Sequence, residues 1–190
     1  EYFLKLWYEV EKNKSSYHEN TNTITWYPIH KGGSSRKWYG NNEYLIKWKN
    51  NGEELKSYII KKYKGGSHTK EIRSEDKYFR QAITWSGISS GIPTFRYGPK
   101  GFIFSSSGPC LFIDDSIIFQ FIAALNSAVS AKLLSFLSPN LSILSGHIAK
   151  IPIIEINKIT PDLSKQLISI SKKDWDFYET SWDFSTFSLM

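Results

Sequence analysis

The chain has 190 residues, 41% hydrophobic and 22% charged, which is typical of a globular protein with one domain or two small ones. Its single cysteine, Cys110, excludes an intramolecular disulfide, and its four histidines lack the spacing of zinc ligands. Residues 1–100 carry 18 Lys and Arg against 10 Asp and Glu, whereas residues 101–190 carry 6 against 8. The first half is therefore expected to meet a polyanion, although a merely solvated basic surface is common at this charge.

The chain begins at Glu1 and shows no cationic segment followed by an apolar one, so no signal peptide is predicted. The single cysteine is consistent with a reducing, intracellular compartment. We expect the chain to be a piece of a longer protein.

Short strands and polar loops are predicted over the first 30 residues. Residues 2–10 alternate loosely between apolar and polar side chains and fit either a strand or a helical turn. Residues 12–23 are polar and loop-like. Residues 24–29 are a strand candidate, and Pro28 confines it to an edge or an end because proline has no amide hydrogen to donate.

Turns at glycine and asparagine residues are predicted in residues 36–52. Two strands, Arg36–Tyr39 and Tyr44–Lys49, are expected on either side of Gly40-Asn41-Asn42, and Asn51-Gly52 is a strong turn signal after them. Period-two alternation puts three apolar side chains of the second strand on one face: Tyr44, Ile46 and Trp48.

The following region is predicted as a meander of short strands with glycine-rich connections. Residues 56–64 fit a strand or a short helix, and a turn is expected before the next strand. Cys110 is interpreted as a buried core residue. Four strands are expected in this region: Ala82–Ser86, Thr94–Tyr97, Phe102–Phe104 and Cys110–Ile113.

One long apolar helix, Ile117–Leu137, is predicted after the helix-capping residues Asp114-Asp115-Ser116, and Pro139 ends it. Its length is close to that of a membrane span. We expect a core helix packed on a sheet instead, because the helix contains several polar residues: Gln120, Asn126, Ser130 and Lys132.

The C-terminal part is predicted to contain short helices. A helical turn is expected at Ser145–Ala149, an extended segment at Lys150–Ile154, and a further helix starting at Thr160-Pro161-Asp162, with proline at its first position. The acidic and aromatic tail DWDFYETSWDF is expected to dock on this domain or on a missing neighbour. Its two tryptophans are interpreted as packing anchors: Trp175 and Trp182.

The stretch from Lys31 to Trp48, KGGSSRKWYGNNEYLIKW, combines residue types that suit nucleic acid. Glycines let a partner approach the backbone closely. Ser, Arg, Lys and Asn provide hydrogen-bond donors, and aromatic side chains provide flat faces between them. This mixture suits an anionic polymer with polar-edged bases better than a small apolar ligand.

No catalytic constellation is predicted. The sequence lacks a phosphate-loop signature and a Rossmann glycine fingerprint. Helix capping accounts for the paired carboxylates at Asp114-Asp115, and the serines at 86 and 105–107 have no companion histidine at a predictable place. We therefore predict no catalytic, cofactor-binding or metal-binding residue in this chain.

Four blocks form one ordered series: KGGSSRKWYGNNEYLIKWKNNGEEL, ITWSGISSGIPTFRYGPKGFIFSSSGPCLF, FIAALNSAVSAKLLSFLSPNLSILSGHIAKIPII and KKDWDFYETSWDF. Over most of residues 31–184 they resemble the C-terminal part of the PglX-type adenine-specific DNA methyltransferases of BREX phage-defence systems. The third block also resembles target-recognition domains of restriction–modification enzymes, including type I specificity subunits. His147 departs from this pattern, in which an acidic residue is more usual.

The resemblance implies a bacterial, cytoplasmic enzyme that uses S-adenosylmethionine to methylate adenine N6 at a specific DNA site. The glycine-rich loop for this cofactor and the Asn-Pro-Pro-Tyr/Phe motif are both absent from these 190 residues. The chain would therefore be a DNA-reading part that is inactive alone. The implied partners are double-stranded DNA, the catalytic domain of the same chain and further defence-system proteins, but no membrane.

DNA contacts are expected from two segments. Arg36 is favoured because a guanidinium can pair bidentately with a guanine edge or a phosphate. Tyr39 is expected to face the DNA while Trp38 packs inward, and the Asn41-Asn42 pair fits either adenine reading or a local turn. The Gly87–Gly91 loop fits either a groove-probing element or a flexible connection. The full set is Lys31, Ser34, Arg36, Lys37, Tyr39, Asn41, Asn42, Ser86, Ser89, Ser90 and Arg96.

We predict an α+β fold. A mostly antiparallel, strand-rich target-recognition domain would cover residues 1–157, backed by the Ile117–Leu137 helix. A small helical tail, residues 158–190, would pack on it or on the missing catalytic domain. The module would position the target adenine for flipping into a pocket on that domain. Two alternatives remain open: a non-catalytic β-rich module that binds carbohydrate or protein through its aromatics, and a specificity module that docks a partner methyltransferase subunit.

Overall fold

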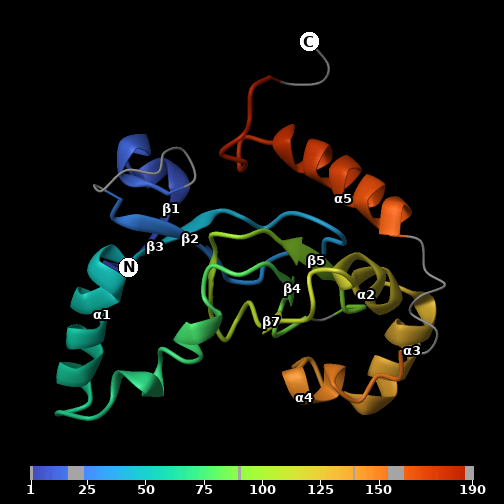
Figure 1. Ribbon diagram of the computed structural model, residues 1–190, viewed down its shortest axis with the longest axis horizontal. Coiled ribbons are helices and arrows are strands. Elements are labelled where there is room, and N and C mark those ends of the chain that lie inside the picture. The colour runs from blue at the N-terminus through green and yellow to red at the C-terminus, as the bar shows by residue number, and fades with distance from the viewer. Residues whose placement is uncertain (1, 17–23, 90, 139, 154–160, 187–190) are drawn as a thin grey trace.

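Two small sheets and five α-helices make up the part of the chain that the computed structural model describes (Figure 1). The described residues are 2–16, 24–89, 91–138, 140–153 and 161–186. The mixture of helices with mostly antiparallel strands confirms the predicted α+β class.

The first sheet has the strand order β1-β3-β2-β6. Its antiparallel strands β1 (Leu4–Leu6), β2 (Trp26–His30) and β3 (Tyr44–Lys47) are joined by the parallel strand β6 (Ile103–Phe104). The strand expected at residues 24–29 is thus confirmed as β2, but the expectation that Pro28 confines it to an edge or an end is wrong, because β2 lies between β3 and β6. This strand lies inside the sheet, but β6 pairs only from Ile29 onward, so the missing amide hydrogen of the preceding proline breaks no ladder.

The second sheet has the order β5-β4-β7, and all its pairings are antiparallel. It contains β4 (Ala82–Trp85), β5 (Phe95–Gly98) and β7 (Cys110–Leu111), near the predicted positions. The prediction of a simple meander is wrong, because the chain leaves this sheet after β5 and forms β6 in the first one. Burial drives that crossing: Ile103 of β6 is packed in the apolar core of the first sheet.

Helix α1 (Lys49–Lys62) packs on the first sheet. Its residue Ile59 lies in a core with Ile29 and with Trp48, which precedes the helix. The turn signal at Asn51-Gly52 is real, since Asn50 to Gly52 all have positive φ angles, but the turn opens a helix and does not close a hairpin. Four short 3-10 turns occur at Trp7–Glu9, Lys12–Lys14, His68–Lys70 and Glu75–Lys77.

The predicted long helix is broken into α2 (Ile118–Leu125) and α3 (Ala128–Leu137), which are bent by 67°. Asn126 ends α2 because its side chain bonds the backbone of Phe95: it accepts from the amide at 3.0 Å and donates to the carbonyl at 2.9 Å. Ser127 then caps α3 by accepting a hydrogen bond from the Ser130 amide. A single helix Ile117–Leu137 was therefore a wrong prediction.

Helix α2 packs on the second sheet, as expected for a core helix. Its buried residues Ile118, Ile122 and Leu125 share one core with Trp85 and Phe95. Among the described residues, no single helix is long and apolar enough to cross a membrane; the bent α2–α3 pair meets that test by length and composition.

The C-terminal elements are α4 (Ser145–Ile148) and α5 (Pro161–Asp176). Both begin where they were predicted. The tail after α5 docks on the described domain. The Trp7 indole donates to the Thr180 carbonyl at 3.0 Å, and the ring centres of Trp182 and Phe102 are 5.9 Å apart. The proposed boundary at 157/158 falls outside the described residues and stays a prediction.

Candidate nucleic-acid interface

The segment between β2 and β3, residues 31–43, crosses from the first sheet to the second. The Trp38 amide donates to the Phe95 carbonyl at 2.9 Å, and the Tyr97 amide donates to the Trp38 carbonyl at 2.8 Å. The predicted strand Arg36–Tyr39 is therefore wrong: it is reduced to one bridge, because Trp38 has a φ of 73° that extended strands do not adopt. Residues 31–43 therefore form a linker that joins the two sheets.

Three loops rich in glycine and serine meet beside this linker, and we call them the glycine–serine platform. They are Gly32–Ser35, Ser86–Gly87 and Ser105–Gly108. Ser86 Oγ donates to the Gly33 carbonyl at 2.9 Å, which ties the second loop to the first. The two segments that the sequence analysis singled out separately thus lie side by side.

The third loop is tied to the other two. The Gly87 amide donates to the Ser107 carbonyl at 3.0 Å, and Ser105 Oγ donates to the His30 carbonyl at 2.9 Å. A Cβ at Gly32 would lie 2.5 Å from the Ser107 carbonyl oxygen, and Gly32 has a φ of +87°. Glycine is required at this position, because backbone meets backbone there.

The platform presents hydroxyl groups to the surrounding water. Four of its serines are exposed: Ser34, Ser35, Ser106 and Ser107. Lys37, two residues after Ser35 in the chain, is also exposed, although its Nζ donates to the Asn126 carbonyl, and none of the three loops contains an Asp or Glu. Hydroxyls, backbone amides and a nearby cation are the groups that contact phosphates and base edges in protein–DNA complexes.

Arg36 is already engaged by the C-terminal helix. Its Nη1 donates to Asp174 Oδ2 at 2.8 Å, and its guanidinium stacks over the rings of Trp175 and Tyr178, 5.0 and 5.5 Å from their centres. A Cβ at Gly40 would lie 2.9 Å from the Arg36 side chain. The predicted DNA contact therefore also anchors α5.

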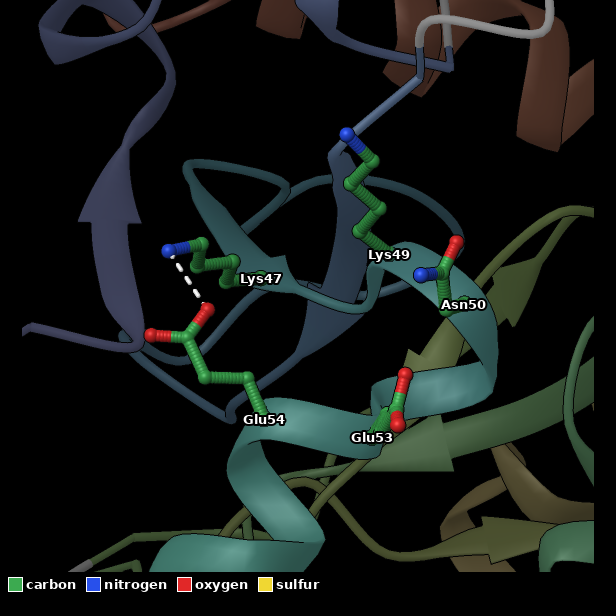
Figure 2. Close-up of a pocket in the computed structure, with 5 residues that line it drawn as sticks. All are labelled: Lys47, Lys49, Asn50, Glu53 and Glu54. Atoms are coloured by element: carbon green, nitrogen blue, oxygen red, sulfur yellow. Dashed lines mark ion pairs between the residues drawn. The ribbon is translucent and has the colours of Figure 1, made fainter.

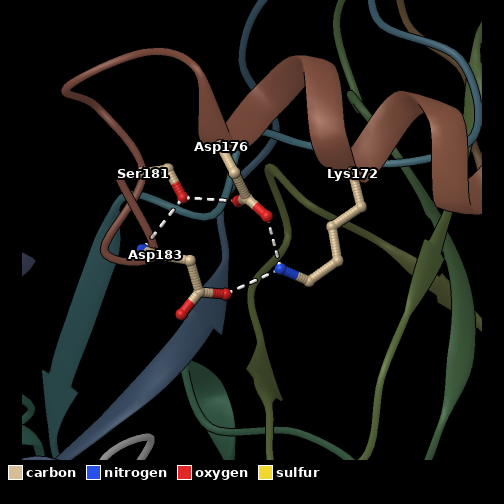
Figure 3. A network of polar contacts seen from close by, with 4 residues as sticks. All are labelled: Lys172, Asp176, Ser181 and Asp183. Carbon is tan, nitrogen blue, oxygen red and sulfur yellow. Dashed lines mark hydrogen bonds and ion pairs between the residues drawn. The ribbon is translucent and has the colours of Figure 1, made fainter. Parts of the chain in front are cut away.

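A second polar network holds the tail beside the linker (Figure 3). Lys172 Nζ donates to Asp176 at 2.6 Å and to Asp183 at 2.7 Å, and Ser181 Oγ donates to Asp176 at 2.7 Å. Burial lowers the pKa of Lys172, but the hydrogen bonds to the two carboxylates outweigh it, so the pKa stands above its ordinary value. Its ammonium lies 5.6 Å from the Tyr39 ring centre.

Arg96 lies beneath the platform and is only 2% exposed. Its hydrogen bonds to the Arg36 carbonyl and to Ser86 Oγ are both long, at 3.5 Å, and no ion pair to it is found among the described residues. Burial lowers its pKa to about 10. In this conformation Arg96 packs under the platform, and neither Arg96 nor the buried platform residue Ser86 reaches the surface.

Three further predicted contacts are also internal. The prediction that Tyr39 faces outward is wrong, because it is 7% exposed, while Trp38 packs inward as expected. Burial raises the pKa of the Tyr39 hydroxyl. Asn41 has a φ of 61°, and its amide donates to the Ser34 carbonyl at 2.8 Å, which favours the turn alternative. Asn42 is buried beside it.

The remaining predicted contacts lie in different places. Lys31 stacks over the Tyr44 ring at 4.3 Å, and Lys37 Nζ donates to the Asn126 carbonyl at 3.0 Å. Ser89 is half-buried, and its amide donates to the Leu141 carbonyl. Ser90 lies outside the described residues.

Sequence reasoning missed the third loop of the platform. Ser106 and Ser107 were noted only as serines without a histidine partner. No local pattern indicates that they follow a strand, β6, that pairs with β2 and so places them beside the end of β2. The available signal was compositional: Ser105–Gly108 repeats the mixture of glycine and serine seen at Gly32–Ser35.

A separate small pocket lies at the start of α1 (Figure 2). It is lined by residues of both charges, and the Lys47–Glu54 ion pair of 2.7 Å occupies one side. Groups of His, Cys, Asp or Glu that could hold a metal ion are absent from the part of the chain that the structure describes. The opposed charges of this pocket do not favour a polyanion, so the platform is the better candidate site. Its lining residues are Lys47, Lys49, Asn50, Glu53 and Glu54.

Two curated relatives match this chain, and both are adenine-specific methyltransferases. More particularly, the chain is 41% identical over 198 residues to the adenine-specific methyltransferase PglX of Lacticaseibacillus casei (strain Zhang). It is 37% identical over 191 residues to the adenine-specific methyltransferase BrxX of Escherichia coli O9:H4 (strain HS). No family model matches the chain.

Both matches cover 99% of this chain but only 16% and 15% of the two relatives. The chain is therefore similar, along almost its whole length, to one segment of PglX-type methyltransferases. This confirms the resemblance seen in the sequence, and it is consistent with the expected C-terminal region.

Proposed function

We propose that this chain is the duplex-DNA recognition module of an adenine-N6 DNA methyltransferase that serves bacterial phage defence in the cytoplasm. The methyltransferase part of the proposal is supported by the two relatives. The DNA part is carried by one observation, the meeting of three glycine–serine loops with exposed hydroxyls beside Lys37 and without a carboxylate.

The platform would bind DNA through Ser34, Ser35, Ser106 and Ser107. The hydroxyls of Ser35 and Ser106 would donate to phosphates or to base edges. The hydroxyls of Ser34 and Ser107, which hydrogen-bond to Asn41 Oδ1 and to Ser105 Oγ within the chain, would offer their oxygens to donors on base edges. Lys31, Arg36 and Lys37 would add positive charge around them. The buried Arg96 and Asn41 would act as positioning residues that hold the loops in place.

Methyl transfer would belong to the rest of the full-length protein. The 190 residues contain neither the glycine-rich loop for S-adenosylmethionine nor the Asn-Pro-Pro-Tyr/Phe motif, so the chain alone should be inactive. The module's task would be to place the target adenine for flipping into the catalytic pocket.

Negative charge introduced on the platform tests the proposal. In the full-length methyltransferase, Ser35→Glu combined with Ser106→Glu puts two negative charges against phosphates, each worth about 1 kcal/mol in water, so duplex binding should weaken about tenfold or more. Ser57→Glu, on an exposed part of α1, is the matched control. Unchanged affinity in the double variant, measured by fluorescence anisotropy at low salt, would overturn the proposal.

A further inference from the structure

Two stretches of the chain carry no Asp, Glu, Lys or Arg: residues 81–95 and residues 133–149. The structure joins them. The Ser89 amide donates to the Leu141 carbonyl at 2.8 Å, and the Ile143 amide donates to the Gly87 carbonyl at 2.9 Å. Two uncharged stretches therefore pair with each other through residues 87–89 and 141–143, in a chain that has 24 basic and 18 acidic residues.

This piece exposes large aliphatic side chains, which we call the apolar patch. Its four residues and their exposed fractions are Ile88 (74%), Ile92 (65%), Leu141 (59%) and Leu144 (59%). Covering such side chains removes apolar area from water, which favours association. An uncharged surface with several exposed aliphatic groups is typical of a site that another surface covers.

The patch is held in place from below. The buried Trp85 indole donates to the Ile143 carbonyl at 2.9 Å, and Ile143 itself belongs to the core of the second sheet. The two loops are thus anchored at the point where they pair, so the aliphatic groups are presented on a formed surface.

The absence of charge from the patch indicates which kind of partner it binds. A surface that binds the DNA backbone needs cations, and these stretches have none. The cores of protein–protein interfaces, in contrast, are depleted in charge. The two relatives contain about six times as much polypeptide as this chain covers, and a covalently linked domain is present at high effective concentration.

We infer that the apolar patch docks on the remainder of the methyltransferase polypeptide and fixes the glycine–serine platform relative to the catalytic domain. Gly87 of the platform is followed directly by Ile88 of the patch, so one short segment joins the two surfaces. The inference rests on the proposed function only in that the chain is part of a longer methyltransferase.

Photocrosslinking in the full-length methyltransferase tests the inference. A p-benzoylphenylalanine in place of Ile88, and in a second protein in place of Leu141, should crosslink to peptides of the same polypeptide outside residues 1–190, independently of protein concentration. The matched control places the probe at Ile60, 39% exposed on α1, which lies at the left of the molecule in Figure 1, away from α4 at the lower right. It should give at most a tenth of that yield.

Crosslinks from both patch positions to a second copy, to DNA, or to nothing would overturn the inference. The crosslinking is done first without DNA, so crosslinks within the polypeptide do not depend on the affinity of the platform for DNA. It is then repeated with DNA, to detect crosslinks from the patch to DNA. Failure of the Ser35→Glu and Ser106→Glu test would remove the DNA proposal and leave the docking result unaffected. The two ideas therefore fail separately.

Discussion

Arg36 and Asp174 form an ion pair of 2.8 Å between residues that are 138 positions apart in the sequence. The pair joins the linker after β2 to helix α5, and Trp175 completes the contact from the same helix. Arg36, which the sequence favoured most strongly for DNA contact, therefore also holds α5 in place. Variants of the two partners of this ion pair distinguish these two roles.

Removing the cation and removing its partner should have opposite effects on DNA binding. Arg36→Ala should weaken binding about fivefold to tenfold, because one positive charge beside the platform is lost. Asp174→Asn should leave affinity unchanged or raise it about twofold, because the guanidinium is freed and a negative charge disappears. Anisotropy titrations at one fixed salt concentration measure both. Equal weakening in the two variants would show that Arg36 acts only by holding α5.

Gly32→Ala should destabilise the fold by about 3 kcal/mol. A positive φ costs an alanine about 1 kcal/mol, and the added Cβ would meet the Ser107 carbonyl oxygen at 2.5 Å, where backbone must shift. Gly101→Ala is the matched control, because Gly101 also has a positive φ but no atom lies within 4 Å of the added Cβ. Urea unfolding should show only about 1 kcal/mol of loss for the control. Equal losses would mean that the platform loops are not packed as described.

Asn126→Ala should reduce the free energy of unfolding by about 2–4 kcal/mol. The substitution leaves the buried Phe95 amide without its hydrogen-bond partner, at about 1–3 kcal/mol, and removes one of the two hydrogen bonds that the Phe95 carbonyl accepts, at about 1 kcal/mol, since the Trp38 amide still donates to that carbonyl. Ser135→Ala, on the exposed side of α3, should change stability by less than about 0.5 kcal/mol. A loss below about 1 kcal/mol for Asn126→Ala would contradict the account of the break between α2 and α3.

His30 should make the fold sensitive to acid. Burial, with a smaller effect of nearby Arg96, lowers its pKa from 6.5 to about 3. Between these values the unfolded chain binds a proton that the folded chain does not, so stability falls as the pH is lowered, by up to about 1.4 kcal/mol per pH unit. Urea unfolding between pH 7 and pH 5 measures the slope. His30→Gln should flatten it, and an unchanged slope in that variant would show that other groups cause the dependence.

Local patterns predicted much of the fold. Alternation located β3, and the face shared by Tyr44, Ile46 and Trp48 does pack in the core of the first sheet. Proline at the first helical position located the start of α5. These features depend on neighbours within a few residues, which is the information that a sequence pattern carries.

The features that were missed depend on residues far apart in the chain. The helix break at Asn126 needs the backbone of Phe95, 31 positions earlier, and the parallel pairing of β6 needs β2. The ring of the buried Tyr39 lies next to the Lys172 ammonium of α5, which is far away in the sequence. The sequence around Arg96 also does not indicate that its side chain is buried, because tertiary packing determines which side chains face inward.

The salt dependence of DNA binding tests the central claim most directly. Fluorescence anisotropy of random-sequence duplex DNA with the full-length methyltransferase, and with the 190-residue chain, should give affinities that fall steeply as salt rises, because phosphate contacts release counterions. The Ser35→Glu and Ser106→Glu variant should bind more weakly at every salt concentration. Binding that barely responds to salt, or a variant that binds as tightly as the unaltered protein, would contradict the claim that the glycine–serine platform reads DNA.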